Sequence, residues 1–178
     1  ANVAQTLGIA FSSDGRFVYI SNFNDTYTVQ TAGGAVSGSS ISAFAFDVKA
    51  KQLTRIGTPM ITGKNPYELA VSHDNRFVYA APYGENDAAG HAKISRYPIL
   101  GDGGLCCALD SPYSVDVSLN PATLRIDPSQ RYMLVGHLGS HGIAELFYIN
   151  PESGDLTPVQ QLTGLAASPF TSTFVEAE

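Results

Sequence analysis

The chain has 178 residues, enough for one domain with a hydrophobic core, and 44% of its residues are hydrophobic while only 15% are charged. This composition excludes a disordered chain and a soluble helical bundle, and its 17 Gly, 10 Pro, 9 Tyr and 9 Phe are typical of short strands joined by turns. The net charge of −6 argues against a nucleic-acid partner, and no apolar run approaches the roughly 18 residues of a membrane span.

Three segments align without gaps, at residues 7–20, 67–80 and 122–135. Each segment predicts a strand A, a tight turn and a strand B, and the turns read Ser-Asp-Gly, His-Asp-Asn and Pro-Ser-Gln. Strand B is apolar at successive positions, so both of its faces are expected to be buried. Sheets stacked radially would bury both faces, as in a β-propeller.

A second aligned block, at 41–47, 94–100 and 144–150, completes each repeat with two more strands. The sequence therefore predicts an all-β fold, a partial β-propeller of about three four-stranded antiparallel blades. The expected bounds are about 7–60 for blade one, 61–114 for blade two and 115–164 for blade three. Residues 165–178 are expected to form a linker or the first strand of a next blade.

Three blades are fewer than the ~4–8 of known rings, and an open arc would expose the apolar flank of its first and last blade. We therefore expect a second copy of the chain, or a second segment of a longer polypeptide, to close the ring. The missing initiating Met favours a fragment of a longer protein. Ser- and Thr-rich loops with few lysines favour a secreted or periplasmic location.

Three stretches carry a family resemblance: NPYELAVSHDNRFVYAAPYG at 65–84, NPATLRIDPSQRYMLVGHLG at 120–139 and INPESGDLTPV at 149–159. They resemble the blades of the lactonase-like seven-bladed propellers, which include 6-phosphogluconolactonase-type hydrolases and carboxy-muconate lactonizing enzymes. The resemblance covers residues 7–162. It implies hydrolysis or isomerisation of a small lactone at the channel rim, with a small cyclic ester or sugar-derived ligand and no cofactor.

The chain departs from the family pattern at the start of its inner strands. Active relatives tend to carry Pro-x-His there, whereas residues 66–68 read Pro-Tyr-Glu and residues 121–123 read Pro-Ala-Thr. The alternative interpretation is therefore a non-catalytic propeller that serves as a binding or scaffold module.

Residues that recur in every blade are expected to serve the blade, whereas a site needs its residues only once. Arg16, Arg76 and Arg131 recur and are predicted to bond turn carbonyls. The residues that break the repeat are expected to share the rim formed by the start of strand A and the end of strand B. Glu68 lies nearest the channel, because strand A is innermost.

These repeat-breaking residues form the candidate site. Glu68 or His137 is the candidate general base, and Arg125 is the candidate cation for the charge that develops on a lactone carbonyl oxygen. The candidate substrate-binding residues are Asp25, Glu85, Thr123 and His141. No metal is assigned, although carboxylates and histidines from different blades are an alternative ligand set.

Two further features complete the sequence-based expectations. The long B–C connections, at 23–39 and 83–91, are predicted to be loops on the same rim as the candidate site. The only cysteines, Cys106 and Cys107, are adjacent. Disulfides favour Cα atoms ~5.5 Å apart, so we expect one cysteine to pack in the blade and the other to face outwards.

Overall fold

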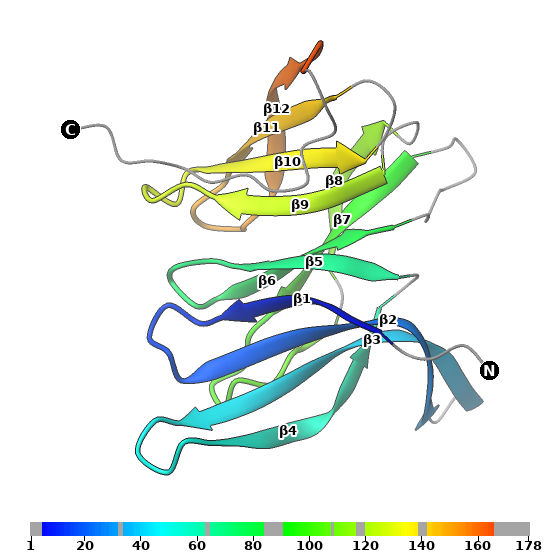
Figure 1. The fold of residues 1–178 in the computed structure, drawn as a ribbon, viewed down its shortest axis with the longest axis vertical. Helices are drawn as coiled ribbons and strands as arrows, with labels where there is room; N and C mark the ends of the chain where they lie inside the picture. Colours follow the sequence, from blue (N-terminus) through cyan, green and yellow to red (C-terminus); the bar gives the residue numbers. More distant parts are fainter. Residues whose placement is uncertain are drawn as a thin grey trace.

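The computed structural model describes residues 5–31, 34–62, 65–83, 91–107, 109–116, 120–138 and 142–165. The described residues form strands and turns without a helix, so none of them forms a helix able to cross a membrane. The strands form three four-stranded antiparallel sheets that lie one above another, as predicted for a partial propeller (Figure 1).

Each sheet is one blade, and its strands follow one another in chain order. Blade one contains β1 (Gln5–Phe11), β2 (Phe17–Thr31), β3 (Gly34–Asp47) and β4 (Gln52–Ile61). Blade two contains β5 (Pro66–Val71), β6 (Phe77–Pro82), β7 (His91–Pro98) and β8 (Leu109–Asp116). Blade three contains β9 (Asn120–Ile126), β10 (Tyr132–Leu138), β11 (Ala144–Ile149) and β12 (Leu156–Leu162). Of the expected 165–178 segment, residues 166–178 lie outside the described residues.

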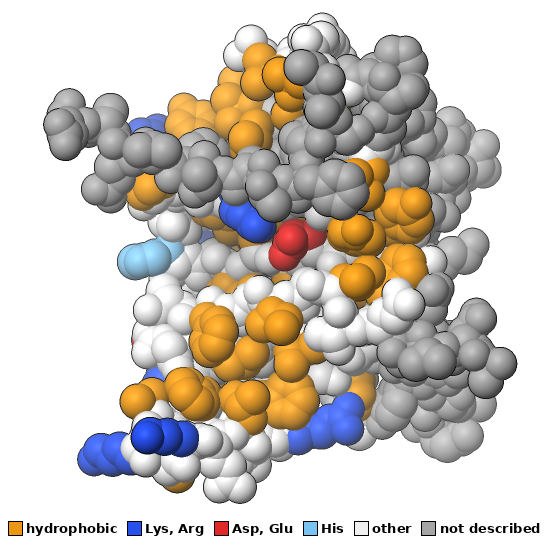
Figure 2. All heavy atoms as spheres, viewed as in Figure 1, with side chains coloured by type: hydrophobic (Ala, Val, Ile, Leu, Met, Phe, Trp, Pro, Cys, Tyr) orange, Lys and Arg blue, Asp and Glu red, His pale blue; other side chains and the backbone are white. Residues whose placement is uncertain are grey.

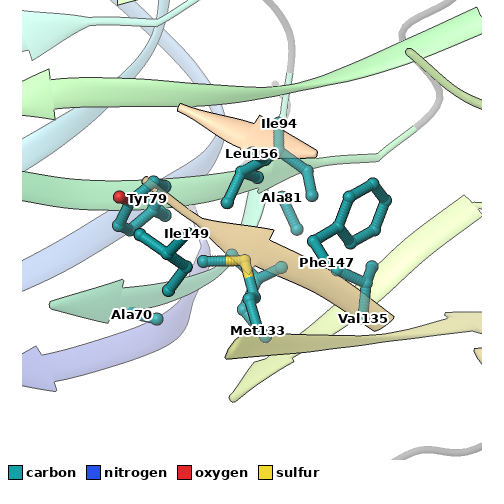
Figure 3. Packing of buried hydrophobic residues seen from close by; sticks show 10 residues of the cluster. Ala70, Tyr79, Ala81, Ile94, Met133, Val135, Phe147, Ile149 and Leu156 are labelled. Atoms are coloured by element: carbon teal, nitrogen blue, oxygen red, sulfur yellow. The ribbon is translucent and has the colours of Figure 1, made fainter. Parts of the chain in front are cut away.

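The core lies between the blades, because each second strand is apolar on both faces as expected. On β6, Val78 and Ala80 face blade one, while Tyr79 and Ala81 face blade three. Figure 3 shows side chains of blade three, among them Met133, meeting those of blade two. Adjacent blades therefore share hydrophobic layers that no single sheet would bury alone.

A buried tyrosine also ties each of the first two blades to the next one. Tyr19 donates a hydrogen bond to the carbonyl oxygen of Gly103 at 3.0 Å, and Tyr79 donates to that of Gly154 at 2.8 Å. Both glycines have positive φ, of 87° and 73°. A Cβ atom at Gly154 would lie 2.7 Å from the ring of Phe77, so the close approach of the blades requires glycine there.

The predicted loop at 23–39 is instead strand for most of its length. β2 and β3 continue to Thr31 and Gly34, with Tyr27 opposite Gly38 after a register shift. The reason lies in the residues themselves, because Tyr, Thr and Val favour an extended pleated chain over a loop. The B–C connection of blade one is therefore a long hairpin.

The face of blade one that points away from blade two carries exposed apolar side chains on β1. Leu7, Ile9 and Phe11 alternate along β1 and are 41%, 55% and 57% exposed. Hydrophobic side chains gather over blade one in the space-filling view (Figure 2). This is the flank that a neighbouring blade would cover in a closed ring, as the sequence predicts.

Candidate functional site

Each inner strand carries a β-bulge near its start. The pairing register shifts between Thr6 and Ile9 on β1, between Pro66 and Glu68 on β5, and opposite the Gly136–His137 step on β9. Bulges re-aim side chains and are frequent beside active sites. The three bulges lie at the rim where the sequence predicts the site.

Glu68 and Arg125 come together across the boundary between blades two and three. The Nη1 atom of Arg125 lies 3.8 Å from Oε2 of Glu68, and β5 contacts β9 directly. In the space-filling view, acidic and basic side chains meet in the middle of the face that the inner strands form (Figure 2). The structure thus joins two of the three predicted catalytic residues.

The carboxylate of Glu68 is partly removed from solvent, with 22% of its side chain exposed. This burial raises its pKa above that of an ordinary glutamate. The nearby charge of Arg125 and a 3.3 Å hydrogen bond from the backbone N–H of Leu69 act in the opposite direction without cancelling the burial. A carboxylate with a raised pKa is a better base than an exposed one.

Arg125 and Thr123 lie on the same side of β9, as the alternation of the strand predicts. Arg125 remains 37% exposed and donates a 2.7 Å hydrogen bond from Nη1 to the carbonyl oxygen of Leu124. Thr123 is buried, and within the described part of the chain its Oγ1 has no hydrogen-bond partner. A buried hydroxyl without a partner is costly, so it is a candidate contact for a polar ligand atom.

A hollow of about 280 Å³ lies across the three inner strands. Its lining includes Phe11 from β1, Leu69 from β5, and Arg125 from β9, together with His73 and Gln130 from two of the tight turns. Arg125 therefore borders both the carboxylate of Glu68 and an open concavity. The hollow extends from the middle of β5 and β9 to the tight turns at the opposite rim, and Glu68 is not part of its lining.

His137 has a different environment. Its side chain is fully buried, and Nε2 lies 3.0 Å from Oε2 of Glu145 on β11. Glu145 pairs opposite Val135, whose side chain belongs to the core shared with blade two. The structure therefore places His137 in a buried hydrogen-bonded pair with Glu145 of the neighbouring strand.

Three other candidates lie outside the described side chains. Glu85 and His141 lie outside the described residues, and Asp25 is described only through the backbone of β2. Within the described residues, no three His, Cys, Asp or Glu side chains are grouped so as to hold a metal ion.

Sequence reasoning missed an aromatic cluster next to Glu68. The rings of Phe23, Tyr67 and Tyr83 contact one another, with centroids 5.4–6.0 Å apart. Tyr67 immediately precedes Glu68, and it stands where the other two repeats have Leu7 and Ala122. The departure of Tyr67 from the repeat is the signal that could have revealed this cluster.

The sequence profile of the family described as "Lactonase, 7-bladed beta-propeller" matches residues 9–111, more than half of the chain. A search of curated proteins finds no match. Among solved structures, a putative 6-phosphogluconolactonase from Bacteroides uniformis superposes with a TM-score of 0.72 at 15% identity, covering 97% of this chain and 45% of that one.

Two further structures agree with this fold. A putative 6-phosphogluconolactonase from Bacteroides fragilis gives a TM-score of 0.64 at 24% identity, over 92% of this chain and 46% of that one. The periplasmic gluconolactonase of Pseudomonas aeruginosa gives a TM-score of 0.57 at 16% identity, over 96% of this chain and 60% of that one. The chain thus spans about half the length of these structures, and at such identities the likeness establishes a shared fold.

Proposed function

Because the chain belongs to the lactonase family of seven-bladed β-propellers, we propose that the completed ring hydrolyses a small, sugar-derived lactone at the rim where Glu68 and Arg125 meet. The 3.8 Å approach of these two side chains from adjacent blades is the observation that carries the proposal. It sets a base beside a cation at the edge of a hollow, which is the pairing that ester hydrolysis needs.

The proposed reaction proceeds through a tetrahedral intermediate. Glu68 removes a proton from a water molecule, whose oxygen attacks the carbonyl carbon of the lactone. Arg125 stabilises the negative charge that develops on the carbonyl oxygen, and the hydroxyl of Thr123 supplies a further hydrogen bond. The ring C–O bond then breaks, and its oxygen takes the proton back from Glu68 to give the open hydroxy acid.

The aromatic cluster of Phe23, Tyr67 and Tyr83 favours a ring-shaped substrate. Binding sites for small molecules combine apolar and aromatic walls with a few polar groups that fix orientation. The cluster joins Phe23 of blade one to Tyr67 and Tyr83 of blade two on the same rim as Glu68, where it would supply an apolar wall. A putative 6-phosphogluconolactonase and a gluconolactonase among the structures of the same fold make gluconolactone the natural first substrate to test.

Completion of the ring is part of the proposal. The exposed apolar flank of β1 supports a further blade beside blade one, supplied by a second copy of the chain or by another segment of a longer polypeptide. The added blades would enclose the channel and contribute any remaining site residues.

The test is the variant Glu68→Gln, assayed for gluconolactone hydrolysis by titration of the acid released. Removing a general base is expected to lower kcat by about 10²–10⁴-fold. Glu152→Gln is the matched control, because Glu152 is an exposed carboxylate in the turn between β11 and β12. Unchanged turnover in Glu68→Gln would remove Glu68 from the reaction.

Folding of Glu68→Gln is checked by urea unfolding. Burial holds the pKa of Glu68 above its unfolded value, so its stabilising contribution belongs to the protonated form and is lost as the pH rises through the folded pKa. At neutral pH the variant is therefore expected to be at least as stable as the parent.

Absence of lactonase activity in the parent ring, with tight gluconolactone binding, would favour the binding-module alternative.

A further inference from the structure

The two cysteines of the chain form a close pair at the outer edge of blade two. Cys106 and Cys107 are the only cysteines, and their Sγ atoms lie 3.0 Å apart. Cys107 is exposed, as expected for one of the two, and Cys106 is half-buried. The thiol of Cys107 is therefore open to reagents, and that of Cys106 is partly so.

The backbone holds this pair in a fixed position. Leu105 bridges to Ile99 across the turn at 100–104, and the N–H of Cys106 donates a 2.9 Å hydrogen bond to the carbonyl oxygen of Pro98. The same turn contains Gly103, whose carbonyl oxygen accepts a hydrogen bond from the hydroxyl of Tyr19 in blade one. The thiols therefore follow a segment anchored both within blade two and to its neighbour.

We propose that Cys106 and Cys107 form a redox-active dithiol, which low-molecular-weight disulfides of the glutathione type oxidise reversibly to a disulfide between adjacent residues. The site lies in the connection between β7 and β8, the two outer strands of blade two, whereas Glu68 and Arg125 lie on the inner strands β5 and β9, so it is independent of the proposed lactonase function. It requires no other residue, because the two sulfur atoms already lie next to each other.

The reaction balances as two thiol–disulfide exchanges. The thiolate of Cys106 attacks one sulfur of the oxidant, forming a mixed disulfide and releasing one thiol. Cys107 then attacks the sulfur of Cys106, closing the ring and releasing the second thiol. A hydrogen bond with Cys106 and repulsion from its charge raise the pKa of Cys107.

Reversibility follows from the geometry of neighbouring residues. Adjacent Cα atoms across a trans peptide bond lie ~3.8 Å apart, below the range of about 4.4–6.8 Å that unstrained disulfides prefer. Strained and exposed disulfides are the easily reduced ones. The bond is therefore expected to respond to redox conditions and not to serve as a permanent structural link.

The test incubates the reduced chain with oxidised glutathione, blocks the remaining thiols and measures the intact mass. The wild type is expected to lose two hydrogen atoms, to carry no glutathione and to resist alkylation at both cysteines. Cys107→Ser is the matched control, because it can form the mixed disulfide at Cys106 but cannot close the ring. Excess reduced glutathione should restore two free thiols in the wild type.

A second measurement uses phenylarsine oxide, which binds stably only where two thiols reach one arsenic atom. The wild type is expected to keep this adduct in excess monothiol, whereas Cys106→Ser and Cys107→Ser should lose it. The proposal is overturned if the wild type retains glutathione as Cys107→Ser does. It is equally overturned if the arsenical leaves the wild type as readily as the variants.

Discussion

In the tight turn of each blade, a serine hydroxyl donates to an aspartate carboxylate. In blade one, Ser12 donates to Asp14 at 2.7 Å, and this bond, together with hydrogen bonds from Arg16, lowers the pKa of Asp14 to about 2. In blade three the two residue types exchange places, and Ser129 donates to Asp127. Blade two has the same bond, from Ser72 to Asp74, so the hydrogen bond is common to all three blades although the aligned positions differ in blade three. An alignment by residue type hides it.

The recurring arginines illustrate what the repeat does reveal. Arg76 donates to the carbonyl oxygens of Pro151 and Glu152 in the next blade, at 2.6 and 3.0 Å, as the sequence predicts for a structural residue. Arg16 binds Asp14 in its own turn at 2.7 Å, just as Arg76 binds Asp74 at 2.6 Å. Recurrence in sequence therefore identifies residues that serve the blade, and the aspartate partner recurs with the arginine in blades one and two.

Arg125→Met is expected to move the acid limb of the pH profile of kcat/KM to higher pH. Arg125 lowers the pKa of Glu68, so its removal lets burial raise that pKa further. A base works only when deprotonated, so activity then fails at a higher pH as the solution is acidified. Loss of charge stabilisation should also reduce kcat by about 10²–10³-fold.

Arg16→Met is the matched control for this profile, because Arg16 lies in an exposed turn and pairs with Asp14. Its acid limb should coincide with that of the parent protein. If Arg125→Met left the limb unmoved, Arg125 would not act on the base of the reaction.

The strands were largely predictable from the sequence, and their connections were not. The second strand of each repeat reads as a run of apolar residues, and β10 is buried on both faces as expected. The hairpin formed by β2 and β3 was missed because Gly and Ser conceal the strand-forming Tyr27 and Val29. The bulge before Glu68 was not predictable either, because its signal lies in the pairing with β6.

The candidate site was predictable only in part, for a similar reason. Glu68 and Arg125 were identified by their departure from the repeat, and strand alternation placed Thr123 beside Arg125. The partner of His137 was not predictable, since Glu145 belongs to the next strand and faces the core between blades two and three. Sequence position gives the rim on which a residue lies but not the side of the sheet it faces after a bulge.

Gly154→Ala is expected to weaken the contact between blades two and three. A Cβ atom would meet the ring of Phe77 at 2.7 Å, and φ is 73°. Left-handed backbone costs a non-glycine residue about 1–2 kcal/mol and overpacking about 1–3 kcal/mol, so the free energy of unfolding should fall by about 2–5 kcal/mol.

The matched control is Gly15→Ala, which has a similar φ of 71° but open space around the new Cβ. Its free energy of unfolding should fall only by the cost of the left-handed backbone, about 1–2 kcal/mol. Equal losses for the two variants in urea unfolding would show that the Phe77 ring does not restrict this turn.

For the molecule as a whole, the exposed flank of β1 determines how the arc associates. Ile9→Glu is expected to weaken self-association of the 178-residue chain at micromolar concentration, because a charge buried in an apolar interface is costly. Native mass measurement gives the populations of monomer and larger species. Val159→Glu, on the outer strand β12, is the matched control and should associate like the parent.

A parent chain that stays monomeric at all concentrations would exclude closure of the ring by a second copy. The ring would then be completed by another segment of a longer polypeptide, and Ile9→Glu would instead lower the stability of that longer protein.

The tyrosine–glycine contacts give the arc a direction. Blade two donates one of these hydrogen bonds, from the hydroxyl of Tyr79, and accepts the other, at the carbonyl oxygen of Gly103. Blade three has Leu134 at the donor position, and blade one has Lys51, at a φ of 55°, at the acceptor position. Among the three described blades, only the middle one therefore carries both the tyrosine donor and the glycine acceptor. A tandem duplication of residues 66–116 is the genetic change by which such a propeller can gain a blade without inventing a new interface.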